Sequence, residues 1–424
     1  AMFDFANQAY TLLIITVVFG DLFTRIIVGD QESGYRLGNF LWSLGLAISY
    51  LLVVLTGPVF GAIMDFSATR KRFLFASYLL TVIATSLLYF VAPGYVLLGL
   101  LLLVISNYAY AIGESFIASF LPDLGRPEDL GKISGFGWAL GYVGGLVATA
   151  FALILLGEVS AENFSRIRWV GPFAGLFFLV AAIPTFLWLR ERGRPRRLKK
   201  TGHYLLLGLR RTRRTFAGLG DFPDLAMLLF STFFAMCGIY IIISFTFIYG
   251  AQVIGWDEPV RVLMFVVVQI TACLGALAFG FLQDRTGAKM IYALTLALWL
   301  VAITLIYLTP AIAVWAQHRF GPAWQAQYIF LVVGLLAGTC LGSTQSAGRA
   351  MVGLFAPRNR AAELFGFWGL FSKAAAIVGL LGIGLLQVAF GLQNSILFCL
   401  VLFGLALVLA LNVDEVRGRA AAKP

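Results

Sequence analysis

Twelve apolar runs, each long enough to cross a lipid bilayer, constrain this chain more than any other feature of its sequence. A spanning helix needs about 20 apolar residues, and it satisfies its own backbone hydrogen bonds inside the membrane. Hydrophobic residues make up 60% of the chain and charged residues 12%, which excludes a water-soluble globule. The runs predict an all-α integral membrane protein with twelve transmembrane helices, at residues 5–28, 39–64, 73–92, 95–120, 131–156, 169–189, 223–250, 260–282, 289–309, 324–347, 361–388 and 392–412.

The net charge of +11 is explained by topology. If the N-terminus is cytoplasmic, twenty-three of the 31 Lys and Arg residues fall in cytoplasmic segments and five in external loops. Basic residues are in excess in the cytoplasmic loops of multi-pass proteins. The bias therefore predicts cytoplasmic termini, and it gives no indication of a nucleic-acid partner. Short termini and loops favour a bacterial inner (plasma) membrane.

A long basic segment separates six runs from the other six. We expect an N-terminal bundle at 1–192, a cytoplasmic linker at 193–221 and a C-terminal bundle at 222–424. Apolar residues occur among the basic residues of the linker, at Leu198, Tyr204, Leu205, Leu206, Leu207 and Leu209, which predicts a short amphipathic helix on anionic lipid head groups. A regulatory binding segment is the alternative.

The two halves contain an internal repeat. Phe3-Asp-Phe-Ala6 recurs as Pro223-Asp-Leu-Ala226, and Gly61-Ala-Ile-Met-Asp65 recurs as Gly280-Phe-Leu-Gln-Asp284. Each helix therefore resembles the helix six further along. Parallel repeats of this kind are typical of transporters that rock two helical bundles around a central site.

The segment Gly280-x-x-x-Asp284-Arg285-x-Gly287-x-Lys289 resembles the signature loop of the major facilitator superfamily. Gly61-x-x-x-Asp65, followed by a basic triplet at 70–72, is its counterpart in the first half. The resemblance implies the fold of that superfamily, two pseudo-symmetric six-helix bundles. Glycine permits close helix contact, and Asp65 and Asp284 can cap a neighbouring helix. We therefore expect a gating role for these two residues and Arg285.

Further segments resemble the branch related to the autophagy-linked vacuolar amino-acid effluxers. They are Asp4-Phe-Ala-Asn7-Gln8-Ala-Tyr10, Leu121-Pro122-Asp123-Leu124, Ser134 to Gly145, Gln345-Ser346-x-x-Arg349 and Phe365-Gly366-Phe367. The resemblance implies a secondary transporter that moves small organic solutes, described for the branch as amino-acid export, by a proton-linked or passive route. It also implies a monomer.

Charged residues inside the spans are costly, so they are candidates for function. Asp4, Asn7 and Gln8 share one face of the first helix, at spacings of 3 and 4, and this face should line the pathway. Asp4 is a gating candidate, with simple capping of the first helix as its alternative. Interhelical hydrogen bonding is the alternative for the other two.

Glu114 shares a helix face with Asn107 and Tyr110. Arg349 occupies the repeat-related position in the second half, eight residues before a proline, as Glu114 does. In the resembled fold these two helices meet across the central cavity. The two residues could form a gating latch, could read the carboxylate and ammonium groups of a substrate, or could be satisfied independently.

Lys373 lies near the middle of its span. It should pair with Glu114 or Asp21, or bind an anionic substrate group. Asp21 and Arg25 have the i, i+4 spacing of a local ion pair. Proton coupling needs a carboxyl group whose pKa can move on burial, and by position Glu114 and Asp21 qualify. Glu363 should act in the first turn of its helix as a dipole partner.

Five uncharged residues complete the pathway candidates: Trp138, Tyr240, Gln269, Gln345 and Trp368. For the two tryptophans, core packing is an equal alternative.

No motif for a cofactor, a metal or catalysis is present. The 4 cysteines fall in apolar runs without metal-ligand spacing, and no nucleotide-binding GxxxxGK[ST] occurs. We therefore predict no enzyme and no cofactor, and as partners a small-molecule substrate and membrane lipids. The leading hypothesis is a secondary active exporter of an amino-acid-like solute, coupled to protons. A transporter of an amphiphile such as a lysolipid or a lipid-linked sugar is the alternative, and a non-transporting membrane sensor is a remote one.

Overall fold

A computed structural model describes residues 1–30, 36–157, 159–191, 203–217, 220 and 222–422. All regular secondary structure in these ranges is helical. Much of the basic stretch expected in the linker, residues 192–202, lies outside the described residues.

Among the described residues, eleven helical segments are long and apolar enough to cross a membrane. The pair Ala389–Ser395 and Phe398–Asn412, bent by 57°, makes twelve if it counts as one span. The expected all-helical membrane fold is therefore confirmed.

The spans of the first half follow the chain order of the apolar runs. They are formed by α1 (Met2–Tyr10), η1 (Thr11–Val17), α2 (Phe19–Leu22), η2 (Phe23–Val28), α3 (Arg36–Ser67), α4 (Arg70–Leu87), η4 (Leu88–Phe90), α5 (Val96–Ala118), α7 (Leu130–Leu156) and α9 (Val170–Trp188). Short helices α6 (Leu121–Leu124), η5 (Pro127–Asp129) and α8 (Phe164–Ile167) connect them, and α10 (His203–Ala217) lies in the linker.

The second half repeats this order. Its helices are α11 (Pro223–Tyr249), η7 (Gly250–Ile254), α12 (Glu258–Thr286), α13 (Ala288–Phe320), α14 (Ala326–Phe355), η8 (Arg358–Arg360), α15 (Ala361–Ser395), α16 (Phe398–Asn412) and α17 (Glu415–Ala421).

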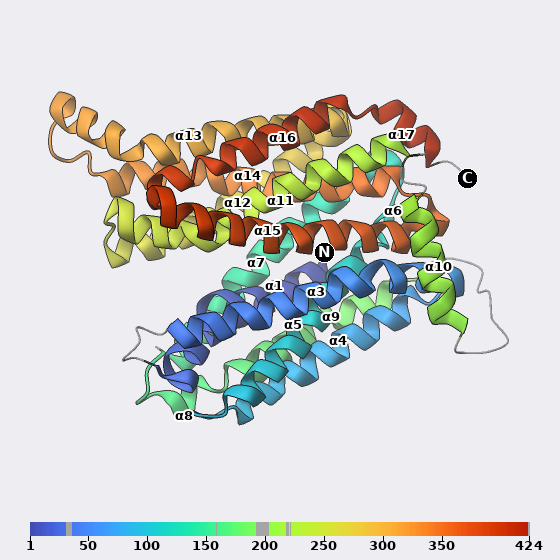
Figure 1. The fold of residues 1–424 in the computed structure, drawn as a ribbon, viewed down its shortest axis with the longest axis horizontal. Coiled ribbons are helices and arrows are strands. Elements are labelled where there is room, and N and C mark those ends of the chain that lie inside the picture. Colours follow the sequence, from blue (N-terminus) through green and yellow to red (C-terminus); the bar gives the residue numbers. More distant parts are fainter. Residues whose placement is uncertain (31–35, 158, 192–202, 218–219, 221, 423–424) are drawn as a thin grey trace. The chain divides into compact units, whose positions relative to one another are not determined.

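The packing of the helices repeats as well. In the first half α3 and α4 pack on α5, and α1 and α4 pack on α9. In the second half α12 and α13 pack on α14, and α11 and α13 pack on α16 (Figure 1). Replacing each helix by its counterpart six spans later converts one set of pairs into the other, so the sequence repeat is a structural repeat.

The chain divides into two compact units, which we describe separately. Unit 1 comprises residues 1–120, 140–213 and 359–370, and unit 2 comprises 121–139, 214–358 and 371–424. Each unit thus includes the first turns of one helix, α7 or α15, whose remainder belongs to the other unit.

Helix α13 is longer than its apolar run predicts. The run was expected to end at 309 because Pro310 follows, yet α13 continues to Phe320. A proline removes one donor but is tolerated in spanning helices, where neighbours satisfy the freed carbonyl. Ala313 and Ala316 are buried beyond it, so packing of one face carries the helix past the proline.

Candidate functional site

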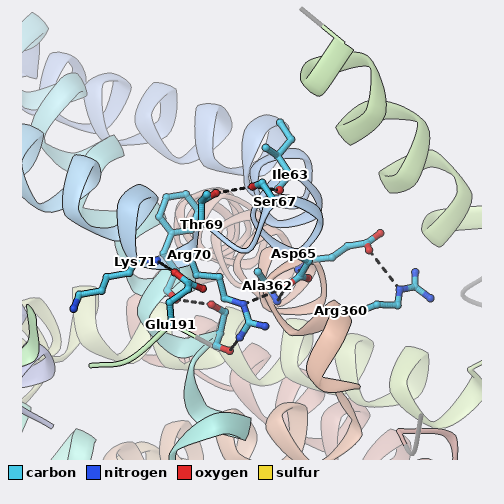
Figure 2. A network of polar contacts seen from close by, with 12 residues as sticks. Ile63, Asp65, Ser67, Thr69, Arg70, Lys71, Glu191, Arg360 and Ala362 are labelled. Carbon is cyan, nitrogen blue, oxygen red and sulfur yellow. Dashed lines mark hydrogen bonds and ion pairs between the residues drawn. The ribbon is translucent and has the colours of Figure 1, made fainter. Parts of the chain in front are cut away.

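Asp65 joins two helices of unit 1. It lies in the last turn of α3, and its carboxylate accepts hydrogen bonds from the backbone N–H groups of Ala362 (3.1 Å) and Glu363 (2.8 Å) in the first turn of α15. Arg70, the first residue of α4, pairs with the same carboxylate at 3.3 Å (Figure 2). The side chains of Asp65 and Arg70 are 0% and 6% exposed. A buried carboxylate therefore satisfies N–H groups that a helix N-terminus leaves without partners, and it complements the helix dipole.

Asp284 repeats this arrangement in unit 2. It lies near the end of α12 and accepts hydrogen bonds from the N–H groups of Gly131 (2.8 Å) and Lys132 (2.9 Å) at the start of α7. A Cβ atom at Gly280 would lie 2.8 Å from the carbonyl oxygen of Gly131, and one at Gly61 would collide with the carbonyl oxygen of Ala362. The glycines of the signature segments thus let each aspartate reach the helix that it caps.

Each unit has one further helix cap near its aspartate cap, and the sequence analysis predicted neither of them. Glu191, just after α9, accepts from the N–H of Lys71 at 2.7 Å, and Glu415 accepts from the N–H of Lys289 at 2.9 Å. Both glutamates follow the last span of their half, and both cap the third span of that half. The sequence feature that could have indicated these caps is the acidic residue that follows the last span of each half.

Arg349 is anchored within unit 2. Its side chain is buried in α14, where Nε donates to Ser134 Oγ (3.1 Å) and Nη2 donates to the carbonyl of Ser134 (2.9 Å). Its guanidinium also lies 5.4 Å from the ring centroid of Trp138. Arg349, the basic member of the charged pair predicted from the repeat, thus connects α14 to the first turns of α7. Its pairing with Glu114 is untested and stays a prediction.

Glu114 ends a chain of hydroxyl groups in unit 1. The Tyr110 hydroxyl donates to Glu114 Oε1 at 3.0 Å, and it lies 2.6 Å from Thr11 Oγ1. The Tyr110 ring stacks on Tyr10 at 4.6 Å between centroids. Asn107 instead donates to a serine hydroxyl of α3. A carboxyl group held by a phenol inside a span can exchange a proton or bind an ammonium group.

Lys373 contacts Tyr240 in unit 2. Its Nζ donates to the tyrosine hydroxyl at 3.1 Å and lies 5.7 Å from the ring centroid. The lysine side chain is buried in α15, and the tyrosine comes from α11. An ammonium group in this position can bind a carboxylate of a solute.

Four further charged residues lie near helix ends. Asp21 and Arg25 form an ion pair of 3.1 Å, with side chains 39% and 51% exposed. Asp4 lies in the first turn of α1, and Arg285 is exposed near the end of α12. The local ion pair predicted from the i, i+4 spacing is therefore present.

The uncharged candidates lie on several helices. Asn7 and Gln269 are buried, whereas Gln8, Gln345 and Trp368 are partly buried. Gln345 donates to the carbonyl four residues before it (3.2 Å), and Trp368 contacts the phenylalanine ring three residues before it. Their roles in a pathway stay predictions.

Groups of three or more metal-ligating side chains do not occur among the residues that the structure describes.

Comparison with known proteins identifies relatives over nearly the whole chain. A family model described as "Vacuole effluxer Atg22 like" matches residues 42–423. The "Uncharacterized MFS-type transporter YxiO" of Bacillus subtilis (strain 168) is 26% identical over 431 residues, 98% of this chain and 94% of that protein. "Autophagy-related protein 22-1" of Penicillium rubens is 22% identical over 467 residues, 92% of this chain and 77% of that protein. Among solved structures, the proton:xylose symporter XylE, a major facilitator superfamily protein, aligns with a TM-score of 0.70 at 15% identity, covering 99% of this chain and 95% of that one.

Proposed function

Because the chain belongs to the Atg22-like vacuole effluxer family of major facilitator superfamily transporters, we propose that it exports small amino-acid-like solutes by alternating access, in exchange for protons. It is a transporter and not an enzyme. The identity of the solute, the direction of its transport and the coupling of transport to protons are what we propose.

The observation that carries the proposal is the chain of Thr11, Tyr110 and Glu114. It places a carboxyl group inside a span of unit 1, with a phenol that can donate to it when it is ionised. Unit 2 has an ammonium group inside a span, that of Lys373. Each of these groups, taken by itself, is complementary to one end group of an amino acid. Charged groups in spans mark substrate and proton pathways in general, so protonation of Glu114 is the proposed coupling step.

We assign gating to the caps and to the anchored arginine. Asp65 and Asp284 each hold the first turn of a spanning helix through two backbone N–H groups. Arg349 holds the first turns of α7 through Ser134. These contacts lie at the predicted cytoplasmic end, and their rupture would free α7 and α15 to move.

Topology and localisation are proposed on the sequence. The basic bias supports cytoplasmic termini, with bundles at 1–192 and 222–424 joined by the linker at 193–221. The relative from Bacillus subtilis supports a bacterial plasma membrane. We propose a monomer as the working unit.

Transport by purified protein in liposomes tests the proposal. Radiolabelled amino acids, short peptides, sugars and lysolipids are compared, with and without a pH gradient. We expect amino acids to move and to respond to the gradient. Glu114→Gln should keep exchange of solute across the membrane but lose the response, since the amide still accepts from Tyr110 but cannot release a proton.

Glu162→Gln is the matched control, because it makes the same change at an exposed glutamate in the same half and should leave the response intact. A Glu114→Gln protein that responds to pH like the wild type would contradict the coupling step. Movement of lysolipids alone would replace the amino-acid proposal with amphiphile transport.

A further inference from the structure

Helix α10 in the linker has two chemically different faces. One face is buried or half-buried against the protein, at Tyr204, Leu207, Gly208, Arg211, Thr212 and Thr215. The opposite face is exposed, at Leu205, Leu206, Leu209, Arg210, Arg213 and Arg214. The spacing of both sets is that of an α-helix. The unusual feature is that most of the leucines are on the exposed face.

The buried face attaches α10 to the end of a spanning helix. A Cβ atom at Gly208 would lie 2.9 Å from the carbonyl oxygen of Val59 and 3.0 Å from the side chain of Ile63, so the two backbones are in close contact. Tyr204 adds an edge-on ring contact with Phe66 at 6.4 Å. Because these partners are in the last turns of α3, which is long and apolar enough to cross a membrane, α10 lies beside the end of a candidate span.

The exposed face has the composition of a helix that lies in a lipid head-group region. Leu205, Leu206 and Leu209 are 56%, 54% and 51% exposed. At about 100° per residue, Leu205 and Leu209 project within about 40° of each other, and the three exposed arginines follow on one side of them. Leucines that enter the acyl boundary beside arginines that pair with phosphates are typical of interfacial helices. The charge of this face fits an anionic bilayer.

One residue of the buried face reaches the capped end of α15. Arg211 Nη2 lies 3.5 Å from Glu363 Oε2, and the Glu363 side chain is 0% exposed. Arg360 pairs with the same oxygen at 3.4 Å. The backbone N–H of Glu363 is one of the two groups that Asp65 caps. Glu363 therefore contacts both the linker helix, through its side chain, and the capping residue Asp65, through its backbone N–H.

We propose that α10 binds anionic lipid head groups through its exposed leucines and arginines, and that this binding strengthens the capped state of α15 through Arg211. Isolated helices of about 12 to 15 residues are marginal in water, and α10 has 15 residues. Lipid on the outer face reduces the ordering cost of holding Arg211 against Glu363, and such coupling is reciprocal.

Hydrogen–deuterium exchange of the full chain in lipid nanodiscs tests both steps. Discs of phosphatidylcholine are compared with discs that also contain phosphatidylglycerol. Each arginine near an anionic surface contributes about fivefold in binding. We therefore expect the α10 amides to exchange at least about fivefold more slowly with the anionic lipid. The amides of Ala362 and Glu363 should slow in the same discs.

Variants separate the two steps. The triple variant Arg210→Gln, Arg213→Gln, Arg214→Gln should lose both effects of the anionic lipid. Arg211→Gln should keep the effect on α10 and lose the effect on α15. Arg319→Gln, which removes an exposed arginine at the end of α13, is the control and should keep both.

Equal exchange of α10 in both discs would overturn the lipid proposal and favour a protein partner for this face. If free glycerol phosphate slows the exchange of the α10 amides in phosphatidylcholine discs, the ligand of this face is a free phosphate, and the proposal that it is the bilayer is overturned. Slowing of α15 that survives Arg211→Gln would overturn the coupling. None of these readouts measures transport, so they stand apart from the proposed solute and proton coupling.

Discussion

Neutralising the two repeat-related caps should have unequal effects on stability. Asp65→Asn leaves the buried guanidinium of Arg70 without its carboxylate, and breaking a buried pair costs about 3–5 kcal/mol. Arg70 keeps its hydrogen bond to the Ser119 carbonyl (3.2 Å), so the lower end of that range applies. Asp284→Asn weakens a cap alone, which costs about 1 kcal/mol, because Asp284 forms no ion pair among the described residues. We expect a difference of about 2 kcal/mol, roughly 30-fold in the unfolding equilibrium.

Urea unfolding of the two variants in detergent micelles, followed by circular dichroism, measures this difference. Asp21→Asn is the control, since an exposed ion pair contributes about 0–1 kcal/mol. If Asp284→Asn is as destabilising as Asp65→Asn, the buried pair with Arg70 contributes nothing. The reasoning from burial is then refuted, and the two caps are equivalent as their sequence motifs suggest.

Two further substitutions test packing by the same unfolding assay. Gly61→Val should destabilise the protein by about 1–3 kcal/mol, as overpacking does, because the new side chain would collide with Ala362. The control Gly404→Ala meets nothing within 4 Å and should be neutral or stabilising. Equal effects of the two variants would contradict the close approach of Gly61 to Ala362. Trp299→Ala should cost about 3–5 kcal/mol, because the ring is fully buried and stacks on Phe403 at 4.9 Å; a loss below about 1 kcal/mol, the range of a surface position, would contradict that burial.

The spans and the repeat could be predicted because they depend on local composition. An apolar run long enough to cross a bilayer has few alternatives to a helix. The extension of α13 beyond Pro310 could not be predicted, since packing rather than propensity carries it. The contact partners of the charged groups could not be predicted from the sequence either. Lys373 is visible as a charge in a span, but its contact with Tyr240 joins residues far apart in sequence. Likewise, an acidic residue after a span becomes a cap only when another helix begins beside it.

The repeat conserves the shape of the caps but reverses the charges beside them. At the start of α7, the residue capped by Asp284 is Lys132, whose Nζ pairs with Asp129 at 2.9 Å. At the start of α15, the residue capped by Asp65 is an acid, Glu363, and it pairs with a base three residues earlier. A buried carboxylate next to another needs added positive charge. In unit 1 this charge comes from Arg70, from Arg360 and from Arg211 of the linker helix. The contact of Arg211 with Glu363 therefore gives the linker helix an electrostatic reason to lie at this cap.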